Sequence, residues 1–186
     1  MDWESLEQAC NACTKCQLCQ GRTNVVFGVG KRDADILFIG EGPGEQEDLQ
    51  GEPFVGPAGK LLDDMLSIID LNRGNCYIAN IVKCRPPGNR DPRDDEQDAC
   101  IDYLRAQTAL IKPKIIICLG RVAASRIIKP DIRISKEHGF WTHKNGVWMM
   151  PMFHPSALLR DPSKRPETFE DLLMLRKKYK ELGIEI

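Results

Sequence analysis

The chain has 186 residues, of which 42% are hydrophobic, and a formal net charge of −1, which suits one globular domain with a single core. The near-neutral charge excludes a general attraction to nucleic acid, so any DNA binding must come from a local basic patch. The N-terminus is polar and no apolar run approaches the roughly 18 residues of a membrane span, so we expect neither a signal peptide nor a membrane helix.

Helices and strands alternate in the predicted secondary structure. The order is helix 3–12, strand 36–39, helix 57–69, strand 76–79, helix 93–110, strand 115–119, helix 121–128, strand 147–152 and helix 166–182. Strands separated by helices predict an α/β fold with a parallel sheet covered on both faces. We see no internal repeat or linker, so residues 1–186 are expected to form a single domain.

Three polar loops follow predicted strands of this sheet. The turn Gly40-Glu41-Gly42-Pro43-Gly44 follows the first strand, Asn80 ends the second, and His154 follows the last. In a parallel sheet these loops meet at one edge, where open α/β sheets bind their ligands. A carboxylate, an amide and an imidazole together can read a polar planar ring and stabilise negative charge on it. The alternative for the glycine-rich turn alone is a tight turn without chemistry.

The chain contains eight cysteines, and without a secretion signal a metal or cluster site is favoured over disulfides. Cys13 and Cys16 form a C-x-x-C motif, which lies within a run of four cysteines spaced three apart. Zinc is the rival metal, but the later cysteines, Cys84 and Cys100, are too far apart to be the second knuckle of a zinc ribbon. We expect Cys118, inside a predicted strand, to be a core residue.

Four segments together resemble a known family. GEGPGEQED, GEPFVGPAG, NIVKCRPPGNRDP and HPSALLR, in this order along the chain, are similar to motifs of the family 4 uracil-DNA glycosylases, which carry an iron–sulfur cluster. The resemblance implies a three-layer fold with a central four-stranded parallel sheet flanked by helices. It also implies an enzyme that removes uracil from DNA in base excision repair. We expect a monomer in the cytoplasm of a bacterium or archaeon, without membrane association.

The resemblance also implies roles for individual residues. The implied uracil-binding residues are Glu41, Gly42, Gly44, Glu47, Phe54, Asn80 and His154, of which His154, Glu41 and Asn80 are also the implied catalytic residues. The implied DNA-binding residues are Lys83, Arg85, Asn89, Arg90, Ser156, Leu158 and Arg160. The implied ligands of a [4Fe–4S] cluster are Cys13, Cys16, Cys84 and Cys100, which would join the N-terminal segment to the loop and helix at 84–100. Cys10 and Cys19 are then spare.

Each of these roles has a physical rationale. A base must leave the duplex before its glycosidic bond is accessible, and Leu158 is placed to fill the vacated space; Leu159 shares that role or packs in the core. Phe54 would stack on the flipped ring. Asn80 would donate to uracil O4 and accept from N3–H, a pattern that cytosine does not match. His154 would stabilise the charge that develops on O2.

Several features qualify this reading. Gly42 stands where the best-known branch of the superfamily has an aspartate base, so we expect catalysis to rely on stabilisation of the leaving group. Glu47 is a candidate for excluding the methyl group of thymine. The segment 84–93 contains no histidine, so no covalent sugar adduct is expected. The basic residues of the loop 85–92, expected to be ordered mainly by the cluster, form either a phosphate track or a solvated surface.

Two other classes of protein would each explain part of the sequence. An electron-carrying or regulatory iron–sulfur protein explains the cysteines but leaves the loops at 40–44, Asn80 and His154 without a purpose. A non-catalytic nucleic-acid-binding module explains the basic loops but not a polar pocket of the size of a base. Removal of uracil from an oligonucleotide distinguishes the enzyme from both.

Overall fold

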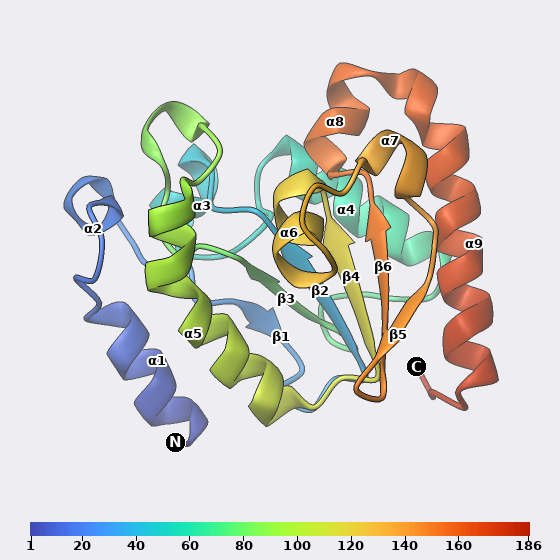
Figure 1. Cartoon of the computed structure of the whole chain (residues 1–186), viewed down its shortest axis with the longest axis horizontal. Coiled ribbons are helices and arrows are strands. Elements are labelled where there is room, and N and C mark those ends of the chain that lie inside the picture. The colour runs from blue at the N-terminus through green and yellow to red at the C-terminus, as the bar shows by residue number, and fades with distance from the viewer.

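The buried apolar runs of the sequence form the strands of one sheet in the computed structural model, which describes residues 1–186 (Figure 1). The strands are β1 Val29–Gly30, β2 Ile36–Gly40, β3 Tyr77–Asn80, β4 Ile115–Leu119, β5 Thr142–Lys144 and β6 Val147–Met152. Their order across the sheet is β1-β3-β2-β4-β6-β5. All residues of β2, β3 and β4 are buried, as expected of parallel strands covered on both faces.

The α/β class is confirmed, but the sheet is larger than the expected four strands. The four central strands, β3, β2, β4 and β6, pair in parallel. At the two edges, β1 and β5 pair antiparallel to their neighbours. These edge strands are only two and three residues long. Segments so short carry no readable alternation of polar and apolar residues, so the sequence did not reveal them.

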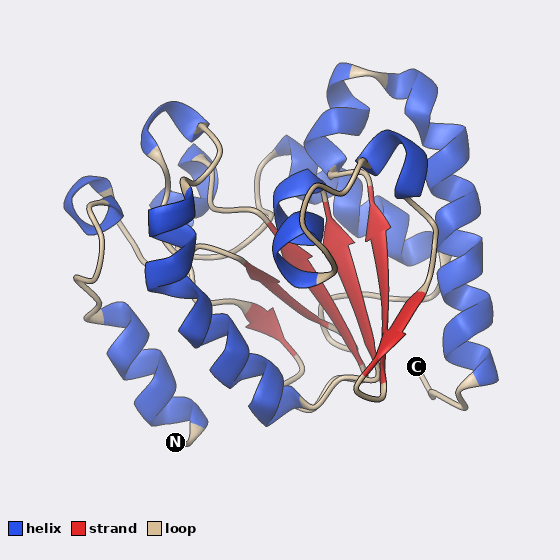
Figure 2. Cartoon of the chain, viewed as in Figure 1, coloured by secondary structure: helices blue, strands red, loops and turns tan.

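Nine α-helices accompany the sheet, and Figure 2 shows them on both sides of it. They are α1 Trp3–Asn11, α2 Leu18–Gly21, α3 Glu45–Gln50, α4 Pro57–Ile68, α5 Asp94–Ile111, α6 Arg121–Ile127, α7 Ile134–Glu137, α8 Pro155–Arg160 and α9 Arg165–Glu181. The five helices predicted from the sequence are α1, α4, α5, α6 and α9, each within two residues of its expected ends. The four that were not predicted have only four to six residues each.

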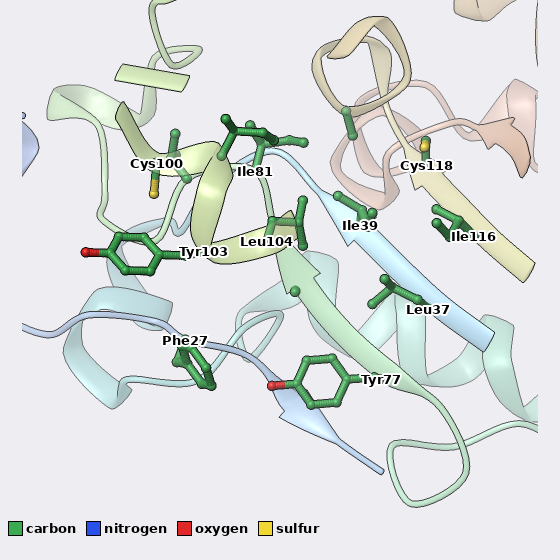
Figure 3. Packing of buried hydrophobic residues seen from close by; sticks show 14 of the residues in the cluster. Phe27, Leu37, Ile39, Tyr77, Ile81, Cys100, Tyr103, Leu104, Ile116 and Cys118 are labelled. Carbon is green, nitrogen blue, oxygen red and sulfur yellow. The ribbon is translucent and has the colours of Figure 1, made fainter. Parts of the chain in front are cut away.

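Side chains of the central strands alternate between two apolar cores, one on each face of the sheet. On the first face, Leu37 and Ile39 of β2 pack with Leu104 of α5, as Figure 3 shows. On the other face, Ile36 and Phe38 of the same strand pack in a cluster with residues of α4 and α9. The expected three layers of helix, sheet and helix are therefore present, and they hold the strand ends rigidly.

Cys118 lies on β4 within the first core, whereas Cys100 lies on α5 (Figure 3). It is fully buried, and burial raises the pKa of its thiol. The expectation that Cys118 is a small core residue is therefore confirmed. No helix combines the length and the apolar character that crossing a bilayer requires.

Candidate functional site

The three polar loops meet at one edge of the sheet, as the parallel arrangement predicts. Gly40, at the end of β2, is directly paired with Asn80 at the end of β3, and His154 follows β6 closely. Together with neighbouring loops they surround a cavity of about 410 Å³. All seven residues expected to bind uracil line this cavity: Glu41, Gly42, Gly44, Glu47, Phe54, Asn80 and His154.

Asn80 presents a buried acceptor that no protein group satisfies. Its side chain is only 2% exposed, and its Oδ1 has no hydrogen-bond partner. A Cβ on Gly40 would stand 2.4 Å from this oxygen and 2.6 Å from Cζ of Phe54, so only glycine leaves both groups their space. A buried acceptor without a partner costs free energy. The arrangement therefore calls for a ligand with an N–H or O–H donor.

Phe54 provides an aromatic wall of the cavity. Its ring stacks beside the imidazole of His154, with 5.5 Å between the ring centroids and 30° between the planes. The residue lies in the left-handed region, with φ +54°, although it is not a glycine. Such a conformation is unfavourable for a bulky residue and persists only when its surroundings enforce it.

His154 is held as a neutral imidazole with a defined tautomer. Burial, assisted by the positive charge of Arg160, lowers its pKa to about 4. Its Nδ1 accepts a hydrogen bond from the backbone N–H of Ser156 at 3.1 Å and lies 2.7 Å from the Oγ of the same residue. Because Nδ1 is an acceptor, the proton of the neutral ring is on Nε2. The histidine can therefore donate one hydrogen bond without carrying a full charge.

Glu41 is held by the first turn of helix α6. Its Oε1 accepts from the backbone N–H of Val122 at 3.4 Å, and burial followed by the nearby charge of Asp91 raises its pKa. Gly120, at the end of β4, has φ +93°, and a Cβ there would lie 2.6 Å from Oε1 of Glu41 and 3.1 Å from Cβ of His154. A glycine at position 120 therefore allows the carboxylate and the imidazole to approach each other.

Glu47 and Gly42 complete the first loop. Oε1 of Glu47 accepts from the backbone N–H groups of Val55 and Gly56, both at 3.3 Å, so it braces the loop that carries Phe54. A Cβ on Gly42 would lie 2.7 Å from Cγ2 of Val82. An aspartate in the place of Gly42 would therefore require Val82 to move.

The residues expected to contact DNA divide into two groups. Asn89, Arg90, Ser156 and Arg160 line the cavity, and Arg85 lies beside them, with its Nε donating to Oδ1 of Asn89 at 2.7 Å. Lys83 and Leu158 lie elsewhere.

The expectation for Lys83 was wrong. Its side chain is 1% exposed, and its ammonium donates to the carbonyl of Phe27 at 3.1 Å and to Oε1 of Gln107 at 2.7 Å. Burial lowers its pKa to about 8. A lysine that follows a strand is usually solvated, but here two acceptors distant in the sequence compensate its burial. Lys83 therefore cannot contact DNA from this position.

The expectation for Leu158 was wrong as well. The segment that follows His154 is not a loop but the helix α8, and Leu158 is on its inner side, 1% exposed within the second core. Leu159 is 42% exposed. An intercalating side chain must stand on the surface. Leu159, the alternative for this role, has the required exposure.

The loop 85–92 is ordered by its own contacts. The guanidinium of Arg90 donates to both carboxylate oxygens of Glu96, at 2.9 and 2.6 Å, and this bidentate pair lowers the pKa of the buried Glu96 to about 2. A second ion pair joins Asp91 to Arg121 at 2.7 Å. The expectation that the loop has little besides a cluster to order it was therefore wrong.

Six of the eight cysteines surround one small pocket between the N-terminal segment and α5: Cys10, Cys13, Cys16, Cys19, Cys84 and Cys100. All eight are free thiols. No group of three or more side chains is placed to hold a single metal ion. A cluster of four irons, by contrast, binds each thiolate at a different corner, so the donor set fits an iron–sulfur cluster.

Neighbouring donors already point at these sulfurs. The guanidinium of Arg22 donates to the carbonyl of Cys13 at 2.7 Å and to Sγ of Cys84 at 3.5 Å. The backbone N–H of Lys83 donates to Sγ of Cys100 at 3.3 Å. Hydrogen bonds to sulfur are a means by which proteins stabilise and tune such clusters. These hydrogen bonds reach three of the four expected ligands, at the sulfurs of Cys84 and Cys100 and at the backbone carbonyl of Cys13.

Some residues that shape the site were not identified from the sequence. Asp91 lines the cavity, and Gly120 and the amide of Val122 hold Glu41. The only signal was that Gly120 follows a predicted strand, like the other polar loops. Arg73, which contacts the backbone of Phe54, gave no signal because it lies in a turn far from any motif.

Comparisons with known proteins agree with this geometry. Residues 27–175 match the model of the uracil DNA glycosylase superfamily. Type-4 uracil-DNA glycosylase of Archaeoglobus fulgidus is 46% identical over 170 residues, which cover 86% of this chain and 84% of that protein. The proteins of the same name from Sulfurisphaera tokodaii and Thermotoga maritima are 44% and 45% identical, over 97% and 86% of this chain and 84% of each relative.

Proposed function

The chain belongs to the uracil DNA glycosylase superfamily, and we propose that it is a type 4 enzyme that hydrolyses the N-glycosidic bond of uracil in DNA. The relatives named as type-4 uracil-DNA glycosylases resemble it over most of their length. The observation that carries the proposal is the buried, unpartnered Oδ1 of Asn80 in a cavity beside the neutral His154.

The cavity offers uracil a matching set of groups. Oδ1 of Asn80 accepts from uracil N3–H, and its amide nitrogen donates to O4. Cytosine has no hydrogen on N3 and carries a donor at position 4, so in this orientation of the amide it would leave Oδ1 of Asn80 buried and unpaired. The ring of Phe54 stacks on the base, and Glu47 stands at the cavity wall as the candidate that crowds the methyl group of thymine.

His154 supports the bond-breaking step. When the bond between C1′ and N1 breaks, its electron pair goes to the base and the charge is shared with O2. The Nε2–H of His154 donates to that oxygen, and a donor already held in position stabilises the developing charge. Water then bonds to C1′ of the sugar cation and loses its proton to solvent, which leaves an abasic site. Glu41 holds the loop and the base and is not needed as a strong base.

The cysteine pocket would hold a [4Fe–4S] cluster through Cys13, Cys16, Cys84 and Cys100. When bound, the cluster would serve as a crosslink between the N-terminal segment and the body of the protein. Arg22 and the amide of Lys83 would donate hydrogen bonds to its thiolates.

DNA would approach along the mouth of the cavity, where Asn89, Arg90, Ser156 and Arg160 contact the backbone and Leu159 enters the stack. The groups assigned to the reaction all lie on this chain, so the proposed reaction needs no second subunit. Relatives from archaea and bacteria support action at the DNA of such a cell.

Incubation with an oligonucleotide that contains one uracil, followed by alkali, tests the proposal. We expect strand cleavage at uracil for the wild type, and its loss in Asn80→Ala and His154→Ala. His143→Ala, a histidine on the exposed edge strand β5, is the matched control and should cleave normally. Absence of cleavage by a brown, iron-loaded wild type, or equal cleavage at thymine, would refute the proposal.

A further inference from the structure

Phe54 is the cavity residue whose backbone is least favourable. Its φ of +54° lies in the left-handed region, which for a non-glycine residue costs on the order of 1 kcal/mol. The ring is nevertheless buried and closely placed, 5% exposed and beside His154. A strained residue in a fixed place requires contacts that hold it there.

Arg73, in the turn between α4 and β3, supplies such contacts. Its Nη1 donates to the carbonyl of Pro53 at 2.7 Å, and its Nη2 donates to the carbonyl of Phe54. Its Nε donates to Oδ1 of Asp63 on α4 at 2.9 Å, and Glu52 lies 3.4 Å from Nη1. The planar guanidinium is thus fixed by α4 and grips two consecutive carbonyls of the loop.

The same peptide also packs closely against α4. A Cβ on Gly59 would lie 1.8 Å from the carbonyl oxygen of Phe54 and 2.8 Å from its Cα. The carbonyl of Phe54 is therefore contacted both by α4 at Gly59 and by the guanidinium of Arg73. These contacts hold the backbone from which the ring projects.

We propose that Arg73 is a positioning residue that holds Phe54 ready for stacking on the flipped base. This inference rests on the proposed function. Arg73 does not line the cavity, so it acts on the base only through Phe54. Preorganisation of this kind matters because a 1 Å misplacement caused by a change outside the reacting groups can cost about 10²-fold in rate.

A double-mutant cycle distinguishes this role from general support of the fold. Single-turnover excision of uracil and inhibition by free uracil are measured for the wild type, Arg73→Gln, Phe54→Ala and the double variant. Arg105→Gln, which removes an exposed surface ion pair, is the matched control. We expect Arg73→Gln to lose roughly 10-fold or more in rate and in uracil affinity. In the Phe54→Ala background the same change should alter either quantity by less than about twofold.

Two results would overturn the inference: an Arg73→Gln variant as active as the wild type, or a loss of equal size in the presence and absence of the Phe54 ring. If Arg73→Gln does not fold, Asp63→Ala, which removes the acceptor of Nε of the guanidinium, takes its place in the cycle with a smaller expected loss. The aromatic NMR signals of Phe54 provide a readout independent of activity and should shift in Arg73→Gln but not in Arg105→Gln. An inactive wild type would refute the proposed function, whereas unshifted Phe54 signals would refute the role of Arg73.

Discussion

The cavity at the sheet edge and the cysteine pocket are built in different ways. The cavity stands on the ends of β2, β3 and β6, whose side chains are fixed in two apolar cores. The cysteine pocket joins α5 and the segment after β3 to a short N-terminal segment with a nine-residue helix and a four-residue helix. The first is organised by packing of the sheet, whereas the second lies where the N-terminal helices pack against α5. We therefore expect changes in the cavity to alter catalysis and changes in the cysteine pocket to alter stability.

The largest effect should come from changes that affect only one of the two regions. We expect His154→Ala to lose roughly 10²–10³-fold in the rate of excision, because it removes a donor to the developing charge. Its iron content should stay that of the wild type, and its urea midpoint should fall only by the cost of the lost cap on α8, about 1 kcal/mol. Cys84→Ala should instead lose its iron and unfold at lower urea concentration, with Cys118→Val as a control for thiol loss in the core. Iron analysis and urea titration check both. A Cys84→Ala protein with full iron would break the comparison.

Leu158 and Leu159 of α8 differ in burial, so we expect their substitutions to have different effects. Leu158→Ala should lower the free energy of unfolding by about 2–5 kcal/mol, because it leaves a hole in the second core. Leu159→Ala should leave stability unchanged within about 0.5 kcal/mol and weaken excision from duplex DNA more than from single strands. Denaturation and single-turnover kinetics on both substrates check these values. The reverse pattern would restore Leu158 as the intercalating residue.

The buried imidazole should make the cavity sensitive to acid. The folded pKa of His154 is about 4, below the ordinary value of 6.5, so between these values the unfolded chain binds more protons than the folded one. Stability should therefore fall as the pH falls from about 6.5 to about 4, by up to about 3 kcal/mol from this residue. The difference between wild type and His154→Gln in urea titrations at several pH values isolates this contribution from that of Glu41. A difference that does not change with pH would contradict the buried neutral state.

The smallest expected effect concerns Arg160 and Lys83, both of which the sequence predicts to contact DNA. Arg160→Ala should weaken DNA binding and reduce the slope of log K against log salt by about 1, as for one lost phosphate contact. Lys83→Met should leave that slope unchanged, because its ammonium is turned inward to Phe27 and Gln107. Salt titrations of binding to an uncleavable DNA measure both slopes. A reduced slope for Lys83→Met would show that this lysine reaches DNA.

Much of the fold and of the cavity could be predicted because the relevant signals are local. The apolar run Ile115–Leu119 and the helical spacing of Leu62 and Leu66 reveal buried elements directly, and parallel strands bring Asn80 and His154 together. What could not be predicted depends on tertiary contacts. Whether Leu158 or Leu159 is buried depends on the start of α8, which the sequence did not show.

The contacts of Lys83 and Arg73 could not be predicted for the same reason, because they also depend on the tertiary structure. Lys83 is buried because its acceptors, Phe27 and Gln107, are 56 and 24 residues away. Arg73 reaches Phe54 across 19 residues that include all of α4. No periodicity or motif encodes such a pairing, so only the folded structure reveals it.

The segment that follows β3 connects the two regions over a very short distance, since Asn80 and Cys84 are four positions apart. Between them, the backbone N–H groups of Ile81 and Val82 donate to the carbonyls of Gly40 and Glu41, at 3.0 and 3.2 Å. These two bonds fasten the chain between Asn80 and Cys84 to the loop after β2. A shift of the backbone that begins at Cys84 must therefore break them before it can displace Asn80.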